Sequence, residues 1–92
     1  MTLLEVVENI NKFSEEHTIY VRRPWMEEAM AVVALETTSG KPPVEAADLD
    51  LSYFLEISVA RAFLNDWAAS QKSEPSIRDK CARLVQYAIN DA

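Results

Sequence analysis

The sequence predicts an α+β fold: a small antiparallel sheet of about three strands with helices packed on one face, in the order α-β-β-β-α-α. Residues 51–70 begin with a two-residue alternation, typical of a strand, and continue with apolar residues three and four apart, typical of a helix. Both ends of the chain carry amphipathic helical patterns. A chain of 92 residues, 49% of them hydrophobic, is enough for one domain spanning residues 1–92.

A first helix is predicted from Leu3 to Phe13. Thr2 and Glu5 have the spacing of a capping box, in which each side chain accepts a hydrogen bond from the backbone N–H of the other residue. A wide apolar stripe follows, formed by Leu3, Leu4, Val6, Val7, Ile10 and Phe13. The polar and acidic residues 14–17 are then expected to form a connection.

Two strands of a hairpin are predicted next. Residues 18–22 are rich in β-branched and aromatic side chains, which favour a strand, and Pro24 ends its pairing because proline has no N–H to donate. Residues 25–28 are then a turn, and residues 29–35 form the second strand. A helix over residues 25–36 is the competing interpretation, since alanine, methionine, leucine and glutamate favour helices.

The longest predicted loop covers residues 37–50. It contains the single glycine of the chain and two adjacent prolines, and residues 44–47 within it are expected to form a short helical turn. A loop of this length in a small domain is often functional, and a plain crossover connection is the alternative.

The centre of the fold is predicted to be a strand that runs directly into a helix within residues 51–70, with Ser58 as the N-cap of that helix. Phe63, Leu64 and Trp67 share one helical face, so we expect them to be buried against the sheet and the last helix.

The last helix is predicted to begin after Pro75 and Ser76, since proline is favoured in a first helical turn, and Ser76 with Asp79 forms a second capping-box spacing. Its apolar face comprises Ile77, Cys81, Leu84, Val85, Ala88 and Ile89.

The charge balance is acidic, with fifteen Asp and Glu residues against nine Lys and Arg residues and a net charge of −6. Such a surface repels phosphate backbones and anionic lipids, which makes nucleic acid and membranes unfavourable partners. Cys81 is the single cysteine and has no internal disulfide partner, which fits a reducing cytoplasm. The acidic N-terminal segment lacks the basic region of a signal peptide.

The residues that usually carry catalysis or hold metals are scarce. His17 is the single histidine, and Cys81 lies on an apolar stripe where a thiol is expected to be unreactive. Metal sites usually combine several histidine or cysteine ligands, and hydrolytic triads need a histidine beside the nucleophile. We therefore expect no catalytic residues, no metal and no cofactor, and we predict that the chain is not an enzyme.

The most distinctive surface signal is the string Tyr20-Val21-Arg22-Arg23-Pro24-Trp25. Tyrosine, tryptophan and arginine dominate the energetic centres of protein interfaces, so Tyr20, Arg22, Arg23 and Trp25 are candidate partner-binding residues. The same residues suit a phosphate or a stacked base. A purely structural alternative is a tryptophan folded over the end of the hairpin, with its ring against the arginine stems.

Glu27 and Glu28 extend this candidate site into an acidic face. They are expected to lie near Glu15 and Glu16 at the ends of the hairpin, and together these side chains would attract a basic partner. The last helix is nearly balanced in charge, which leaves the acidic residues concentrated in the first two thirds of the chain.

Three strings, TIYVRRPW, SYFLEISVAR and KCARLVQYAINDA, resemble a group of small acidic uncharacterised bacterial proteins. Size and acidity also resemble antitoxins and immunity proteins, and this resemblance implies a protein that neutralises or regulates a partner. We therefore expect a non-enzymatic protein-binding protein acting through its acidic face. A small ligand-binding, enzymatic or nucleic-acid-binding module that uses Arg22, Arg23 and Trp25 is the alternative.

Overall fold

The computed structural model describes residues 1–36 and 43–91 of the chain. Its order of elements agrees with the predicted α-β-β-β-α-α order and adds two short helices, as the bounds show: α1 (Leu3–Glu8), a 3-10 helix η1 (Ile10–Lys12), β1 (Thr18–Val21), β2 (Ala31–Ala34), α2 (Val44–Ala47), β3 (Ser52–Glu56), α3 (Ile57–Ala69) and α4 (Ile77–Asp91). The predicted helical turn at residues 44–47 is thus present as α2, whereas residues 37–42 of the predicted loop lie outside the described residues.

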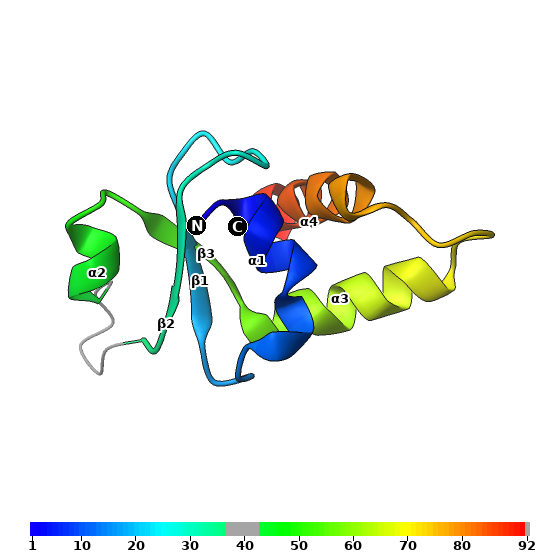
Figure 1. Cartoon of the computed structure of the whole chain (residues 1–92), viewed down its shortest axis with the longest axis horizontal. Helices are drawn as coiled ribbons and strands as arrows, with labels where there is room; N and C mark the ends of the chain where they lie inside the picture. Colours follow the sequence, from blue (N-terminus) through cyan, green and yellow to red (C-terminus); the bar gives the residue numbers. More distant parts are fainter. Residues whose placement is uncertain (37–42, 92) are drawn as a thin grey trace.

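The sheet is antiparallel, with strand order β2-β1-β3, so that β1 lies in the centre. Figure 1 shows α1, α3 and α4 on one face of the sheet and α2 on the other. The α+β prediction is therefore confirmed, and the three longer helices do share one face. The short α2 adds a small second layer, in which Ala46 and Leu51 pack with Tyr20 of β1.

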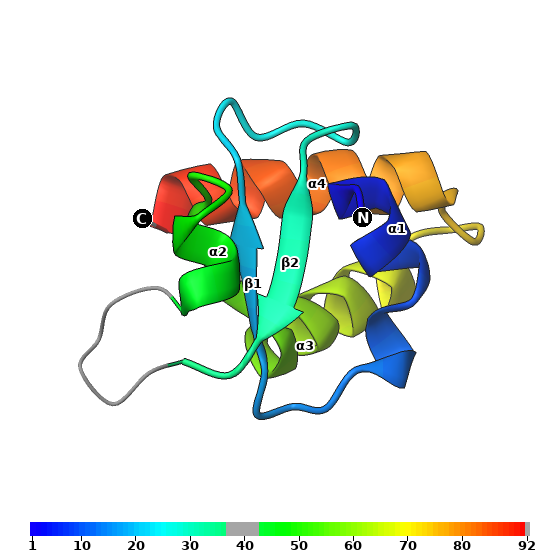
Figure 2. The ribbon, with the colours of Figure 1, turned by 60° about the vertical axis from the view of Figure 1, so that its left-hand side comes forward.

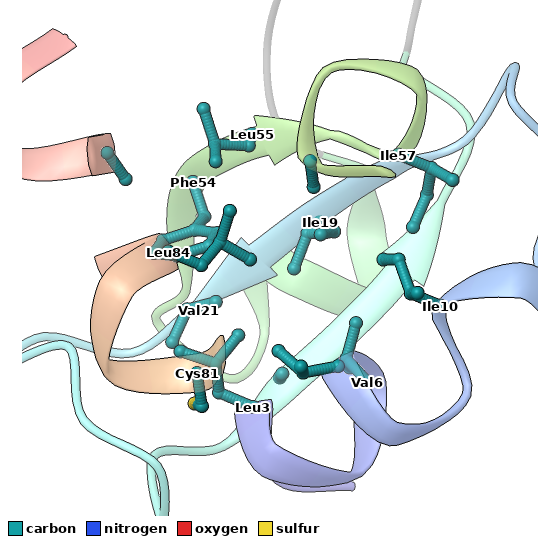
Figure 3. Packing of buried hydrophobic residues seen from close by; sticks show 14 of the residues in the cluster. Leu3, Val6, Ile10, Ile19, Val21, Phe54, Leu55, Ile57, Cys81 and Leu84 are labelled. Atoms are coloured by element: carbon teal, nitrogen blue, oxygen red, sulfur yellow. The ribbon is translucent and has the colours of Figure 1, made fainter. Parts of the chain in front are cut away.

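The main core lies between the sheet and the three longer helices (Figure 3). Ile19 and Val21 of the central strand are completely buried there, as expected for alternate residues of a strand that is paired on both sides. The helices contribute Leu3, Val6, Ile57 and Leu84, whose side chains converge on this face. The predicted apolar stripes of the first and last helices thus form the core.

A β-bulge interrupts the predicted alternation in β3. Ile19 pairs with Leu55, whereas the next residue, Tyr20, pairs with Tyr53, so that Phe54 has no opposite residue. Phe54 and Leu55 are therefore both buried in the main core, although they are adjacent in the sequence. The strict two-residue period expected for this segment had placed Phe54 on the opposite side from Leu55.

The start of α3 differs from the predicted one. The helix begins at Ile57, with Glu56 as N-cap and no side-chain cap, so Ser58 lies inside the first turn. The backbone N–H of Ile57 donates instead to the carbonyl oxygen of His17, at 3.0 Å. The pairing of β1 with β3 thus continues to the first residue of α3, and the chain passes from strand to helix without a break. A cap at Ser58 would instead have accepted from an N–H two or three residues further on.

The first helix is shorter than predicted. The capping box is present, since the Thr2 N–H donates to Glu5 Oε1 at 2.9 Å and the Glu5 N–H donates to Thr2 Oγ1 at 3.2 Å. The pKa of the Glu5 carboxyl is lowered by the Thr2 N–H and by the Thr2 hydroxyl, which also donates to Glu5 Oε1, at 3.2 Å. The α-helix ends at Glu8, where the side-chain amide of Asn9 donates to the carbonyl oxygen of Glu5, and the chain continues as the 3-10 helix η1.

The competing helix over residues 25–36 is absent, and Ala31–Ala34 forms β2, paired with β1. Tertiary pairing has therefore overridden the helical preference of alanine, methionine and glutamate in this segment. The observed strands are shorter than predicted, because Arg22 lies outside β1 and Leu35 lies outside β2.

The predicted buried face of α3 is only partly buried. Leu64 is in the main core, but Phe63 and Trp67 remain partly exposed. Phe63 packs against the main core and stacks on Tyr87, with ring centroids 4.2 Å apart, so it makes the predicted contact with the last helix. In α4, Ile89 belongs to the predicted apolar face yet is 58% exposed. Toward their linked ends α3 and α4 extend away from the sheet, as Figure 1 shows, whereas Ile89 lies near the opposite, C-terminal end of α4.

Candidate functional site

The connection between β1 and β2, residues 22–30, is held against the rest of the fold by Trp25. Its ring meets Phe54 of β3 edge-on, with centroids 5.0 Å apart and an angle of 85° between the planes. The indole Nε1–H donates to the carbonyl oxygen of Val21 at 3.3 Å. Trp25 therefore packs over the end of the hairpin, as the structural alternative predicted, and this contact positions the neighbouring residues.

Arg22 and Arg23 are both exposed, yet each guanidinium group is held in place (Figure 2 shows this loop beyond the ends of β1 and β2). Arg22 donates from Nη2 and Nε to the carbonyl oxygen of Leu49, at 2.8 and 3.3 Å. Arg23 lies over the ring of Trp25, 4.5 Å from its centroid, and its Nε lies 3.4 Å from Ser52 Oγ. The remaining guanidinium N–H groups are pre-positioned donors, because much of the side-chain entropy has already been lost.

The far side of the loop is fixed to two helices. Glu27 forms an ion pair with Arg78 of α4, and its backbone carbonyl oxygen accepts a hydrogen bond from the N–H of Leu4 in α1. The N–H of Leu3 donates to the carbonyl oxygen of Ala29 in the same way, at 2.9 Å. The loop is thus attached to β3, α1 and α4, which gives its surface a defined shape.

This surface contains an apolar cavity of about 450 Å³, which we call the methionine cavity. Met26 and Met30 from the loop, together with Met1, supply large exposed apolar side chains. The full lining comprises Met1, Thr2, Arg22, Arg23, Pro24, Met26, Glu28, Ala29 and Met30. Pairing of Thr2 with Met30 brings the start of the chain to this loop. We refer to the methionine cavity with Arg22 and Arg23 as the loop surface.

Of the predicted site residues, the loop surface brings together Arg22, Arg23 and Glu28, whereas Trp25 packs inward on Phe54 and supports Arg23 from below. Tyr20 is not among them, because it is only 3% exposed and packs with Ala46 and Leu51 on the other face of the sheet. Burial, and the nearby carboxylate of Glu36, raise the pKa of the Tyr20 hydroxyl. The expectation that Tyr20 is a surface anchor is therefore wrong.

The expected acidic face is not continuous. Glu15 and Glu16 precede β1, whereas Glu27 and Glu28 follow it, so the two pairs lie at opposite ends of that strand (Figure 2). Glu15 accepts from Arg61 Nη1 at 3.3 Å, and Glu27 is paired with Arg78. Two of the four carboxylates are therefore already neutralised, and the expected proximity of the two pairs is wrong.

The sequence interpretation missed the methionines. Met26 lies in the predicted turn and Met30 in the predicted strand, so their helical spacing of four residues had no meaning there, and no pattern relates either of them to Met1. The available signal was compositional: two of the three methionines in the chain lie within five residues, beside two arginines and a tryptophan. Only the pairing of the N-terminal segment with the loop brings the third methionine to them.

Cys81 of α4 lies beneath the loop, at the edge of a smaller cavity of about 290 Å³ lined by Trp25, Met26, Glu27, Cys81, Ala82 and Val85. The thiol is buried, and this burial, with a smaller contribution from the negative charge of Glu27, raises its pKa to about 11. A thiolate is thus strongly disfavoured here, in agreement with the expectation of an unreactive thiol.

This raised pKa predicts a loss of stability at alkaline pH. The thiol's ordinary pKa is 9.0 and its folded pKa is about 11, so the unfolded state releases the proton first as pH rises. The contribution of the buried thiol to the free energy of unfolding is complete below pH 9. It is lost between pH 9 and 11, which lowers that free energy by about 2–3 kcal/mol in total. In urea unfolding, the free energies of the wild type and of Cys81→Ala should therefore converge over this range. If the free energies of unfolding of the two proteins changed in parallel with pH, the raised pKa of Cys81 would be contradicted.

The described residues offer no evident centre for metal chemistry. Within residues 1–36 and 43–91, no three His, Cys, Asp or Glu side chains are grouped closely enough to hold a metal ion. Nor does any helix in the same residues have the length and apolar character needed to cross a bilayer. What the loop surface offers chemically is contact: apolar side chains beside fixed hydrogen-bond donors.

Comparison of the chain with family models, curated proteins and solved structures gives no significant match.

Proposed function

We propose that the chain is a non-enzymatic protein-binding domain whose contact surface is the loop surface. The observation that carries this proposal is the methionine cavity, because three exposed methionines line it beside two arginines held in fixed positions. Methionine is flexible and polarisable, and it adapts to apolar side chains of different shapes. Arginine and tryptophan are enriched among residues that dominate binding energy.

The arrangement suits binding because the backbone of the β1–β2 loop is already fixed before a partner arrives. Trp25 and Glu27 fix the loop, and the backbone of Leu3 and Leu4 attaches it to α1. A partner therefore meets a surface whose backbone is already in place, so less conformational entropy is lost on association. Neutralising or regulating a partner by covering its surface, as antitoxins and immunity proteins do, needs no more than this, and the single cysteine fits a cytoplasmic setting.

The acidic face is a weaker candidate for the same role, since its carboxylates are separated and partly paired. A small anion or a phosphate group bound between Arg22 and Arg23 is weaker still. The cavity beside these residues measures about 180 Å³ and includes Asp50, whose carboxylate repels an anion. Protein binding through the methionine cavity is therefore the function that the geometry supports best.

A photo-crosslinking amino acid placed at position 26 tests the proposal in the cells that make this protein. We expect irradiation to trap one specific partner there, and we expect little product from the same group at Gln71. Gln71 is an exposed residue of the link between α3 and α4, and Figure 1 shows this link well away from the loop. The trapped protein is then purified and its affinity is measured by calorimetry.

Substitution Met26→Asp should weaken that affinity at least about tenfold, because it places a charge in an apolar contact. This affinity measurement tests both the identity of the partner and the position of the site. Binding that is unchanged by Met26→Asp but lost on reversal of Glu15 and Glu16 would transfer the function to the acidic end of β1. Crosslinking that is equal at positions 26 and 71 would contradict the proposed surface.

A further inference from the structure

Neither arginine of the loop surface forms an ion pair with a carboxylate in the described part of the chain, and the same holds for Lys12, Lys72 and Arg83. Among the described cations, Arg61, Arg78 and Lys80 each pair with a carboxylate. Arg22 and Arg23 instead contact a carbonyl oxygen, a hydroxyl oxygen and an aromatic ring. Among the acidic side chains that the structure describes, none forms an ion pair with either guanidinium group.

These contacts leave both guanidinium groups charged, exposed and fixed in position. A carbonyl oxygen orients Arg22 without neutralising it, and the ring of Trp25 orients Arg23 in the same way. Arginine binds carboxylates with planar, often paired hydrogen bonds, and the geometry is most favourable when the guanidinium is already oriented. The loop surface is therefore prepared for carboxylates supplied by another molecule.

The apolar cavity and the two guanidinium groups lie next to each other. Arg22 and Arg23 belong to the lining of the methionine cavity itself, so an apolar side chain inserted between Met26 and Met30 brings its neighbouring residues to the guanidinium groups. Glu28 also lines the cavity, and it is exposed without an ion-pair partner in the described part of the chain. Its charge opposes an acidic ligand and favours a basic one, so replacing Glu28 tests whether the ligand is acidic or basic.

We infer that the partner's contact element is an acidic peptide segment, in which an apolar side chain fills the methionine cavity and flanking carboxylates bind Arg22 and Arg23. This inference rests on the proposed function and specifies the chemistry of its partner. Glu28 at this cavity and Asp50 in the neighbouring one both oppose an acidic ligand. Both guanidinium groups are already oriented by their contacts, however, so they lose less entropy when they pair with the ligand's carboxylates.

Three synthetic peptides with blocked ends probe this chemistry: GSDELDESG, its apolar deletion GSDEADESG, and its basic counterpart GSKKLKKSG. Binding is followed by NMR of the protein labelled with carbon-13 at its three methionine methyl groups. Met26→Leu and Met30→Leu variants assign the signals. We expect the acidic leucine peptide to shift the Met26 and Met30 signals with a Kd on the order of 1 mM or tighter, as for a short isolated segment.

The alanine peptide should bind at least about fivefold more weakly, and the basic peptide should leave both signals unchanged. Arg23→Ala should weaken binding of the acidic peptide by about fivefold to tenfold, whereas Glu28→Gln should strengthen it by about twofold to threefold. Arg83→Ala is the matched control, because Arg83 also lies over an aromatic ring, that of Phe63, but on α4, away from the loop. It should change binding by less than about twofold.

The inference is overturned by equal or tighter binding of the basic peptide, by unchanged affinity in Arg23→Ala, or by the absence of any shift at concentrations of about 5 mM. The proposed function fails separately, through the crosslinking experiment at position 26. A partner that is trapped there but binds through a basic or neutral segment would preserve the proposed function and refute the acidic specificity.

Discussion

Replacement of Leu84 by alanine is expected to lower the free energy of unfolding by about 3–5 kcal/mol. Leu84 has no exposed surface and lies in the main core between α4 and the sheet (Figure 3). Alanine removes apolar contacts from close-packed neighbours and leaves a cavity that rigid strands cannot fill. A domain of this size has roughly 5–13 kcal/mol of total stability, so the variant should lie close to the limit of folding.

Urea unfolding followed by circular dichroism measures this loss, with Ile89→Ala as the matched control. Ile89 lies five residues further along the same helix and was predicted to share its apolar face, but it is 58% exposed. Its truncation should cost less than about 1 kcal/mol, since it removes little buried area. Similar losses for the two variants would mean that the position of α4 on the sheet is wrong.

The comparison of these two residues shows what the sequence could and could not predict. Helical periodicity places Leu84 and Ile89 on the same stripe, and it correctly identifies the helix and its buried side. It does not show where the sheet ends beneath the stripe, which is a property of tertiary packing. The same limit explains Phe63, which was predicted to be buried against the sheet and the last helix: its ring contacts Tyr87 of that helix, but the side chain is only partly buried.

The remaining differences in the fold also come from long-range pairing. Ser58 is a good N-cap residue by local rules, yet the carbonyl oxygen of His17 satisfies the first donor of α3, forty residues away in the chain. The bulge opposite Ile19 and Tyr20 likewise depends on how two distant strands align. Capping at Thr2, by contrast, involves only neighbouring residues and was predicted correctly.

The candidate site was half predictable for a related reason. The string from Tyr20 to Trp25 is a candidate site because of its residue types, but residue types do not show which side of the sheet each side chain points to. Tyr20 turns toward α2 because alternate residues of β1 point to opposite faces, and Trp25 turns back over Phe54. The methionine cavity requires the chain start to pair with the loop, which no local pattern indicates.

Removal of the Trp25 side chain is the second large effect that we expect. Trp25→Ala should lower the free energy of unfolding by roughly 2–3 kcal/mol, less than for a fully buried ring because Trp25 is partly exposed. Trp25→Phe should cost only about 1 kcal/mol. It keeps a ring against Phe54 but loses the Nε1–H donor, and the Val21 carbonyl oxygen still accepts from Ser52 Oγ at 3.2 Å.

The local consequence of Trp25→Ala separates its role in the loop from its role in overall stability. Cys81 lies in the cavity that Trp25 and Met26 cover, so release of the loop should expose the thiol. Labelling by a disulfide reagent in native buffer should accelerate at least about tenfold in Trp25→Ala, through local opening, while Leu64→Ala, a core truncation in α3, should have a smaller effect at equal loss of stability. If labelling instead follows global stability alike in both variants, Trp25 does not hold the loop. The arginines would then lack the fixed geometry on which acidic recognition depends.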